Sequence, residues 1–117
     1  MIVDVEELQR FLEVAVSSVE INAMITFKSM FGGKMAYADG RPMASLSNVG
    51  LAFKLAPKDQ EDLLTGGGER LRYEPDAPPS KQYIVVPDAM LSNGGTLGSW
   101  AAKSAAFVLS LPEKKKK

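Results

Sequence analysis

The sequence contains no cysteine and no histidine among its 117 residues. The missing cysteines exclude disulfides, thiol nucleophiles and zinc–thiolate sites. The missing histidines remove the commonest general base and the commonest metal ligand. The remaining residues form no recognisable catalytic pattern, so we expect a protein that is not an enzyme and has no catalytic residues, metal ligands or cofactor.

Long hydrophobic runs are also missing, because no apolar stretch approaches the roughly 20 residues needed to cross a bilayer. Residues 1–7 are acidic and do not resemble a signal peptide. We therefore expect a cytoplasmic protein with no membrane contact. The composition is 45% apolar and 24% charged, as in ordinary globular domains. We predict a single domain over residues 1–112 and a flexible lysine tail at 113–117.

The zero net charge hides an uneven distribution. Four of the fourteen basic residues are Lys114 to Lys117, so residues 1–113 carry ten basic side chains against fourteen acidic ones. We interpret the tail as a solvated chain end; the alternative is a tether to nucleic acid or another anionic surface. Since an acidic body is poorly suited to binding a duplex, we expect no direct contact with nucleic acid.

Three segments have the apolar spacing and end signals of helices. Asp4 can cap the first helix, in which apolar residues recur at helical spacing over residues 5–19. A second, short helix is predicted over residues 57–64, followed by the glycines at 66–68. Thr96 can cap a last helix that ends near Leu111.

Short β-prone runs separated by turn residues fill the rest of the chain. Asp39-Gly40 and residues 48–50 predict hairpins. Gly32-Gly33 either joins two strands or kinks one, and we favour a tight connection. The predicted strands are residues 24–31, 34–38, 43–47, 51–55, 70–73 and 83–86. The expected fold is therefore a two-layer α+β domain, with an antiparallel sheet and helices on one face.

A set of motif residues runs in order along the chain: Met30, Phe31, Gly32, Gly33, Tyr37, Asp39, Gly40, Arg41, Lys54, Tyr73, Tyr83, Pro87 and Trp100. From about residue 24 to residue 108, the order and spacing of these residues resemble the amino-terminal domain of the TfoX/Sxy competence-regulator family, with departures at Met35 and Ala52. The resemblance implies the element order α-β3-α-β2-α, similar to secretion-chaperone-like domains, and a cytoplasmic regulatory or accessory role. We expect a stand-alone domain, since the second, helical domain of longer members is absent.

Basic residues on the predicted strands suggest a possible anion site. By the period of two along a strand, Arg70 and Arg72 share one face, and Lys54 could align with them. The alternative is that these charges are simply solvated.

Two functions follow from these observations. The first is a non-catalytic protein-interaction domain with a regulatory role, which we expect to form a homodimer and to bind a further protein. A link to transcription or competence regulation is an extension of this prediction. The alternative is a domain that binds a small ligand or an anion.

Overall fold

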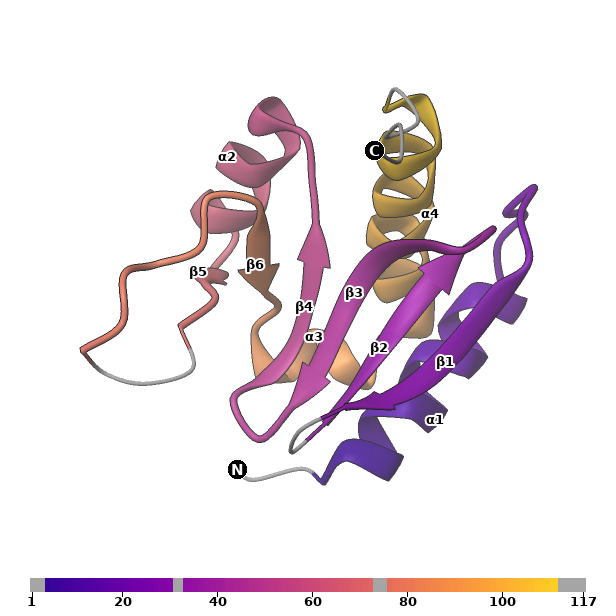
Figure 1. Ribbon diagram of the computed structural model, residues 1–117, viewed down its shortest axis with the longest axis horizontal. Coiled ribbons are helices and arrows are strands. Elements are labelled where there is room, and N and C mark those ends of the chain that lie inside the picture. The colour runs from indigo at the N-terminus through magenta and orange to yellow at the C-terminus, as the bar shows by residue number, and fades with distance from the viewer. Residues whose placement is uncertain (1–3, 31–32, 73–75, 112–117) are drawn as a thin grey trace, which may run out of the picture.

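The computed structural model describes residues 4–30, 33–72 and 76–111. In this part of the chain, six antiparallel strands form one layer and the helices form a second layer on one face of the sheet (Figure 1). This arrangement confirms the predicted α+β class. The elements are α1 (Val5–Ser17), β1 (Ile25–Met30), β2 (Gly33–Ala38), β3 (Arg41–Ser47), β4 (Gly50–Lys54), α2 (Pro57–Thr65), β5 (Glu69–Arg70), β6 (Tyr83–Val85), α3 (Asp88–Leu91) and α4 (Gly94–Ser110).

The strands lie in the order β1-β2-β3-β4-β6-β5. This arrangement differs from the expected order α-β3-α-β2-α, because four strands precede α2 and the short helix α3 precedes α4. Met30 pairs with Gly33, so β1 and β2 are two paired strands rather than one kinked strand. The predicted tight connection falls on Phe31 and Gly32, which lie outside the described residues.

The prediction of a strand over residues 70–73 is wrong for Leu71 and Arg72, and Tyr73 lies outside the described residues. The strand β5 contains Glu69 and Arg70 alone. The Leu71 amide still donates to the Tyr83 carbonyl oxygen at 2.9 Å, but the Leu71 carbonyl accepts from the Ser80 amide at 2.8 Å. The chain therefore leaves the sheet at Leu71 and pairs with its own returning loop.

Both long helices begin at a side-chain cap. The Asp4 carboxylate accepts from the Glu7 amide at 2.9 Å, which confirms the predicted start of α1. The predicted cap of α4 is wrong, because Asn93 rather than Thr96 caps it. Asn93 Oδ1 accepts from the Thr96 amide at 3.2 Å, so the two glycines after Asn93 lie in the first turn of the helix.

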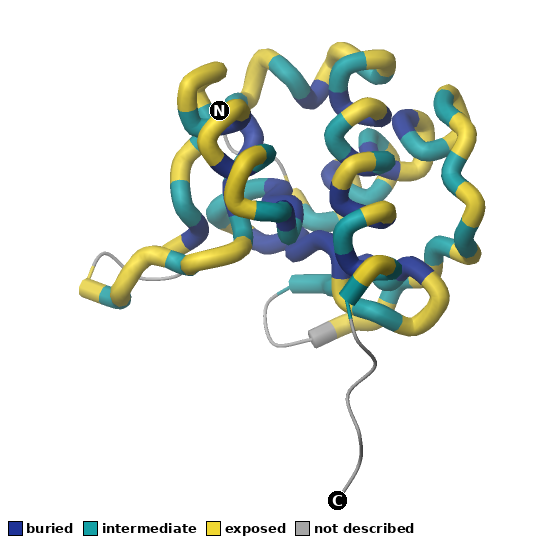
Figure 2. The backbone as a smooth tube through the Cα atoms, turned by 90° about the horizontal axis from the view of Figure 1, so that it is seen from above, coloured by how far each residue is buried: buried dark blue, intermediate teal, exposed yellow. Residues whose placement is uncertain are grey.

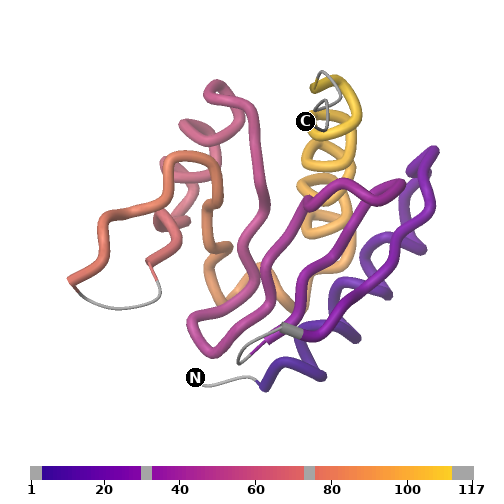
Figure 3. Tube along the Cα trace, viewed as in Figure 1, coloured from indigo at the N-terminus to yellow at the C-terminus, as the bar shows by residue number. Residues whose placement is uncertain are grey.

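The helices α1 and α4 lie next to each other behind the sheet, as the chain trace shows from indigo to yellow (Figure 3). Their apolar sides and one face of the sheet enclose the core, which is dark blue in Figure 2. Phe53 of β4 lies in this core without solvent exposure, and so does Leu55, the first residue after β4. Alternate residues of this segment therefore point toward the helices.

A β-bulge in β3 adjoins the buried side of α4. Ala36 pairs with Ala44 but Tyr37 pairs with Pro42, so Met43 is an extra residue on β3. Ser104 Oγ on α4 lies 2.7 Å from the Met43 carbonyl oxygen and is itself fully buried. A polar side chain of the helix thus provides a hydrogen-bond donor where the bulge disturbs the ladder.

Candidate functional site on the open face of the sheet

One face of the sheet has no helix packed on it among the described elements, and this face is turned toward the viewer in Figure 1. Side chains alternate between faces along a strand, so cross-strand pairing determines which residues lie together. Phe53 pairs with Ile84 toward the helices, so the adjacent pair, Ala52 with Val85, points the other way. We call this side the open face; it carries Thr26, Lys28, Met35, Tyr37, Pro42, Ser45, Ser47, Ala52, Lys54, Glu69, Tyr83 and Val85.

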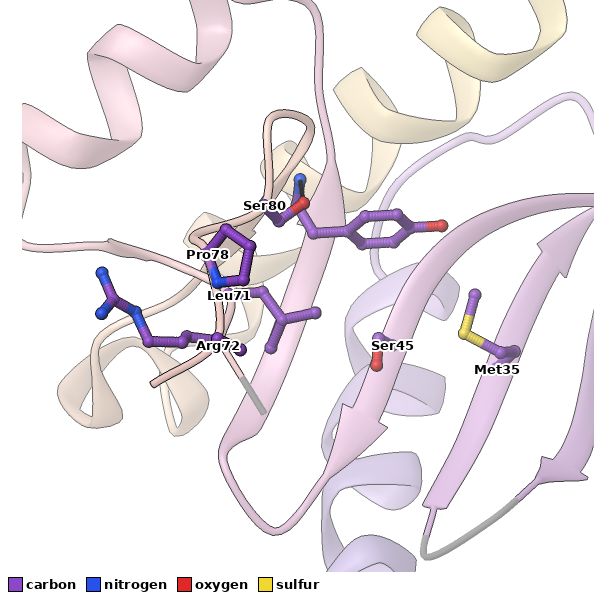
Figure 4. Close-up of a pocket in the computed structure, with 8 residues that line it drawn as sticks. Met35, Ser45, Leu71, Arg72, Pro78 and Ser80 are labelled. Atoms are coloured by element: carbon purple, nitrogen blue, oxygen red, sulfur yellow. Dashed lines mark hydrogen bonds between the residues drawn. The ribbon is translucent and has the colours of Figure 1, made fainter. Parts of the chain in front are cut away.

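A cavity of about 250 Å³ lies on the open face. Figure 4 shows Leu71 on one side of it pointing toward Ser45, with Met35 beyond, whereas the Arg72 guanidinium points away from both. Ser45 is only 3% exposed although no described helix covers it. The lining is therefore mainly apolar, with Arg72 at its outer rim. The lining residues are Met35, Ser45, Leu71, Arg72, Ala77, Pro78, Ser80 and Tyr83.

The loop that forms one wall of this cavity is tied to the sheet by Ser80. The Ser80 amide donates to the Leu71 carbonyl, as described above, and Ser80 Oγ accepts from the Tyr83 amide at 3.0 Å and from the Gln82 amide at 3.2 Å. These bonds hold residues 76–80 beside β6 and fix the position of Tyr83 at the start of that strand. The cavity wall is thus a formed part of the fold.

Two lysines stand next to cavity residues on the open face. Lys28 pairs with Met35 across β1 and β2, and Lys54 pairs with Tyr83 across β4 and β6. Directly paired residues have their β-carbons about 4.5–5.5 Å apart, so both ammonium groups can reach the space above the cavity. Glu69, on the edge strand β5, is the acidic residue of this face. The open face is therefore basic on a chain whose residues 1–113 are acidic overall.

The predicted anion patch is not assembled as the sequence suggested. Arg70 pairs with Ile84 and so lies on the helix side of the sheet, opposite Lys54. The Arg70 guanidinium donates to Gln60 Oε1 of α2 at 2.9 Å and to the Ser80 carbonyl at 3.3 Å. The prediction that Arg70 and Arg72 share a strand face is wrong, because Arg72 lies beyond the end of β5.

The family motif Asp39-Gly40-Arg41 has a structural role in the described fold. Asp39 and Gly40 have positive φ angles of 52° and 83°, which gives the tight two-residue turn between β2 and β3. Asp39 Oδ1 accepts from the Met24 amide at 2.9 Å, next to the start of β1. Arg41 donates to the carbonyl oxygens of Val108 at 2.8 Å and Leu111 at 2.6 Å, at the end of α4.

Other motif residues divide between packing and the open face. Gly33 begins β2, where a β-carbon would collide with the Leu46 carbonyl oxygen. Pro87 precedes the first turn of α3, and Trp100 is half-buried on α4 with Lys103 Nζ 5.4 Å from its ring centre. Tyr37, Lys54 and Tyr83 lie on the open face, as given above. The side chain of Met30, and all of Phe31, Gly32 and Tyr73, lie outside the description.

Sequence reasoning missed the cavity residues Met35, Ser45, Leu71 and Pro78, and also Lys28. A usable signal exists for Ser45, because polar residues alternate with buried apolar ones along β3. The cavity itself depends on the return of residues 76–80 to the sheet, which no local pattern indicates.

A second hollow, of about 410 Å³, lies between α1 and the start of α4. It is bordered by Val14, which is 62% exposed, and by Phe11 and Leu91. Over residues 4–30, 33–72 and 76–111, no helix is long and apolar enough to cross a membrane, and no cluster of acidic, histidine or cysteine side chains could hold a metal ion.

The family comparison agrees with the sequence resemblance. The model of the TfoX N-terminal domain matches residues 20–108 of the 117-residue chain, which span every described strand and most of α4. The comparison with curated proteins gives no match. Because the family match covers well over half of the chain, the chain belongs to the TfoX N-terminal domain family.

Proposed function

We propose that this chain is a non-catalytic, cytoplasmic regulatory domain that binds another protein through the open face of its sheet. The observation that carries the proposal is the cavity of about 250 Å³ on a sheet face that no described helix covers. Membership of the TfoX N-terminal family supports a regulatory role, and a link to transcription or competence regulation is part of the proposal.

The composition of the open face supports protein binding. Met35, Tyr37 and Tyr83 are each half-exposed on it. Methionine and tyrosine are enriched in protein interfaces, because methionine adapts its shape and tyrosine combines an apolar ring with a polar hydroxyl. The partner suited to this face presents apolar side chains together with acidic ones, given the two lysines beside the cavity.

A variant on each side of the molecule tests the proposal. Tyr37→Glu places a charge on the open face, and Val14→Glu places the same charge on an exposed apolar residue of α1. Proteins captured from a cell lysate by the wild type should also bind the Val14→Glu variant, but they should not bind the Tyr37→Glu variant. Thermal unfolding confirms that each variant is folded. Loss with Val14→Glu and retention with Tyr37→Glu would place the interface on the helix side and refute the proposal.

We further propose that a second copy of the chain pairs along β1. This strand is an edge of the sheet, whereas the opposite edge β5 has two residues. The Asp39 backbone amide donates to the Met24 carbonyl oxygen, so by the alternation of antiparallel ladders the amides of Ile25, Phe27 and Ser29 face outward. An unpaired edge of this length is a template for a second strand.

Ser29→Pro tests the dimer, because proline removes an outward amide without removing a bond to β2. The wild type and Ser29→Ala should be dimeric in light scattering at tens of micromolar, and Ser29→Pro monomeric. A wild-type monomer under these conditions would exclude the dimer.

The alternative function, binding of a free small ligand or anion, has weaker support. The residues proposed for it, Lys54, Arg70 and Arg72, do not lie together. The Arg70 guanidinium donates hydrogen bonds to Gln60 and Ser80 on the helix side of the sheet.

A further inference from the structure

We propose that the cavity on the open face receives one large apolar side chain from an extended segment of the partner, and that acidic residues flanking this side chain contact Lys28 and Lys54. This inference rests on the proposed function and specifies the chemistry of the partner. It is carried by the size of the cavity, by its lining and by the position of the two lysines.

The size of the cavity favours a single side chain. Small-molecule pockets usually enclose about 300–1,000 Å³, so about 250 Å³ is too little for a nucleotide or a similar cofactor. It is enough for one aliphatic or aromatic group. An interface commonly depends on one such anchor in a pocket, surrounded by weaker contacts.

The lining favours an apolar group over a charged one. Met35, Leu71, Ala77 and Pro78 contribute carbon and sulfur atoms, and the Arg72 guanidinium points away from Ser45 (Figure 4). Among the described lining residues, Arg72 is the cationic one, and it points away from Ser45, so a carboxylate buried beside Ser45 would lose its hydration without a cation in the lining to replace it. The anchor is therefore expected to be Leu, Ile, Met, Phe or Trp.

The charges around the cavity favour acidic neighbours of that anchor. Lys28, on β1, and Lys54, on β4, are cross-strand partners of the lining residues Met35 and Tyr83. A segment that lies across the sheet with its anchor in the cavity would pass both lysines. Lys28 is exposed and Lys54 half-exposed, so these contacts steer and select the partner more than they bind it.

Selection from random displayed peptides tests the inference. Peptides panned on the wild type should combine a large apolar residue with Asp or Glu within a few positions. A synthetic copy of an enriched peptide should bind Lys28→Glu/Lys54→Glu about tenfold or more weakly, because like charges then face each other. Lys58→Glu, a single exposed charge reversal on α2, is the control away from the open face and should leave the affinity of the peptide unchanged.

A cavity-filling variant supplies the second arm. Ser45→Leu extends a side chain into the space and should abolish peptide binding, while the amide spectrum shows whether the fold is retained. Should Ser45→Leu not fold, Met35→Trp tests the same space from the neighbouring strand. Enriched peptides that bind both charge-reversed and cavity-filled variants normally would overturn the inference.

The result is separable from that of the proposed function. If Tyr37→Glu loses the cellular partner but no peptide is enriched, the open face binds a folded surface and the inference is wrong while the function stands. If dimerisation is lost in Ser45→Leu, the cavity is occupied by a second copy of the chain, which also overturns the inference.

Discussion

A β-carbon on Gly98 of α4 would lie 2.6 Å from the carbonyl oxygen of Ala15 on α1. The missing side chain at Gly98 therefore sets how closely the two long helices approach. The neighbouring atom belongs to the backbone of α1, which cannot move aside as the end of a flexible side chain could.

Gly98→Ala should destabilise the fold. Alanine is favoured over glycine in a helix by about 1 kcal/mol, but forcing a methyl group against the Ala15 carbonyl should outweigh this and cost about 1–3 kcal/mol net. Urea unfolding measures the difference. Gly95→Ala on the same helix is the control: its nearest neighbour would be Asn93 Oδ1 at 3.9 Å, so it should be neutral or stabilising. Equal effects at the two positions would contradict the close approach.

Ser104→Ala should also lower stability, for a different reason. Ser104 Oγ lies within 2.8 Å of the carbonyl oxygens of both Met43 and Lys54, which share its single proton, and alanine removes this donor. The expected cost is about 1–3 kcal/mol in the free energy of unfolding. Ser99→Ala, at an exposed position of α4, should change it by less than about 0.5 kcal/mol. A cost as small at Ser104 would show that the hydroxyl does not matter.

Arg41→Met should loosen the end of α4. The charged donor at the Val108 and Leu111 carbonyls contributes about 1–3 kcal/mol, and a positive group at a helix carboxyl end is favourable as well. Hydrogen exchange should accelerate in the last turn of α4 and stay unchanged in α1. Arg10→Met, an exposed arginine of α1, should leave α4 protected. Uniform acceleration over the whole chain would indicate a global effect instead.

The turn between β2 and β3 should distinguish two substitutions of Asp39. Asn tolerates the positive φ of 52° and keeps an oxygen for the Met24 amide, so Asp39→Asn should cost little. Asp39→Ala loses both properties and should cost about 1–2 kcal/mol in thermal unfolding. Equal stability of the two variants would refute a role for the side-chain oxygen.

Much of the fold could be predicted because its signals are local. Asp4 and the apolar spacing after it determine where α1 begins and which side it buries, and Asp39-Gly40 determines a hairpin whose twist suits antiparallel strands. These patterns depend on a few neighbouring residues. They therefore remain readable without knowledge of the tertiary structure.

The candidate site could not be predicted because it depends on distant contacts. The Leu71 carbonyl bonds to Ser80 instead of continuing the ladder, which ends β5 and separates Arg70 from Arg72. The cap of α4 is a separate and local case: Asn93 and Thr96 are both residues that can cap a helix, and the Asn93 side chain accepts from the Thr96 amide. Local propensity hardly distinguishes a strand that ends at Arg70 from one that continues, or a cap at Asn93 from a cap at Thr96.

The turn at Asp39, Gly40 and Arg41 joins the beginning of β1, the hairpin and the carboxyl end of α4 at one corner. These three residues stabilise the fold, so a relative can keep them even if the open face of its sheet binds a different partner. In relatives that share these three residues, differences in binding should therefore come from the side chains on the open face.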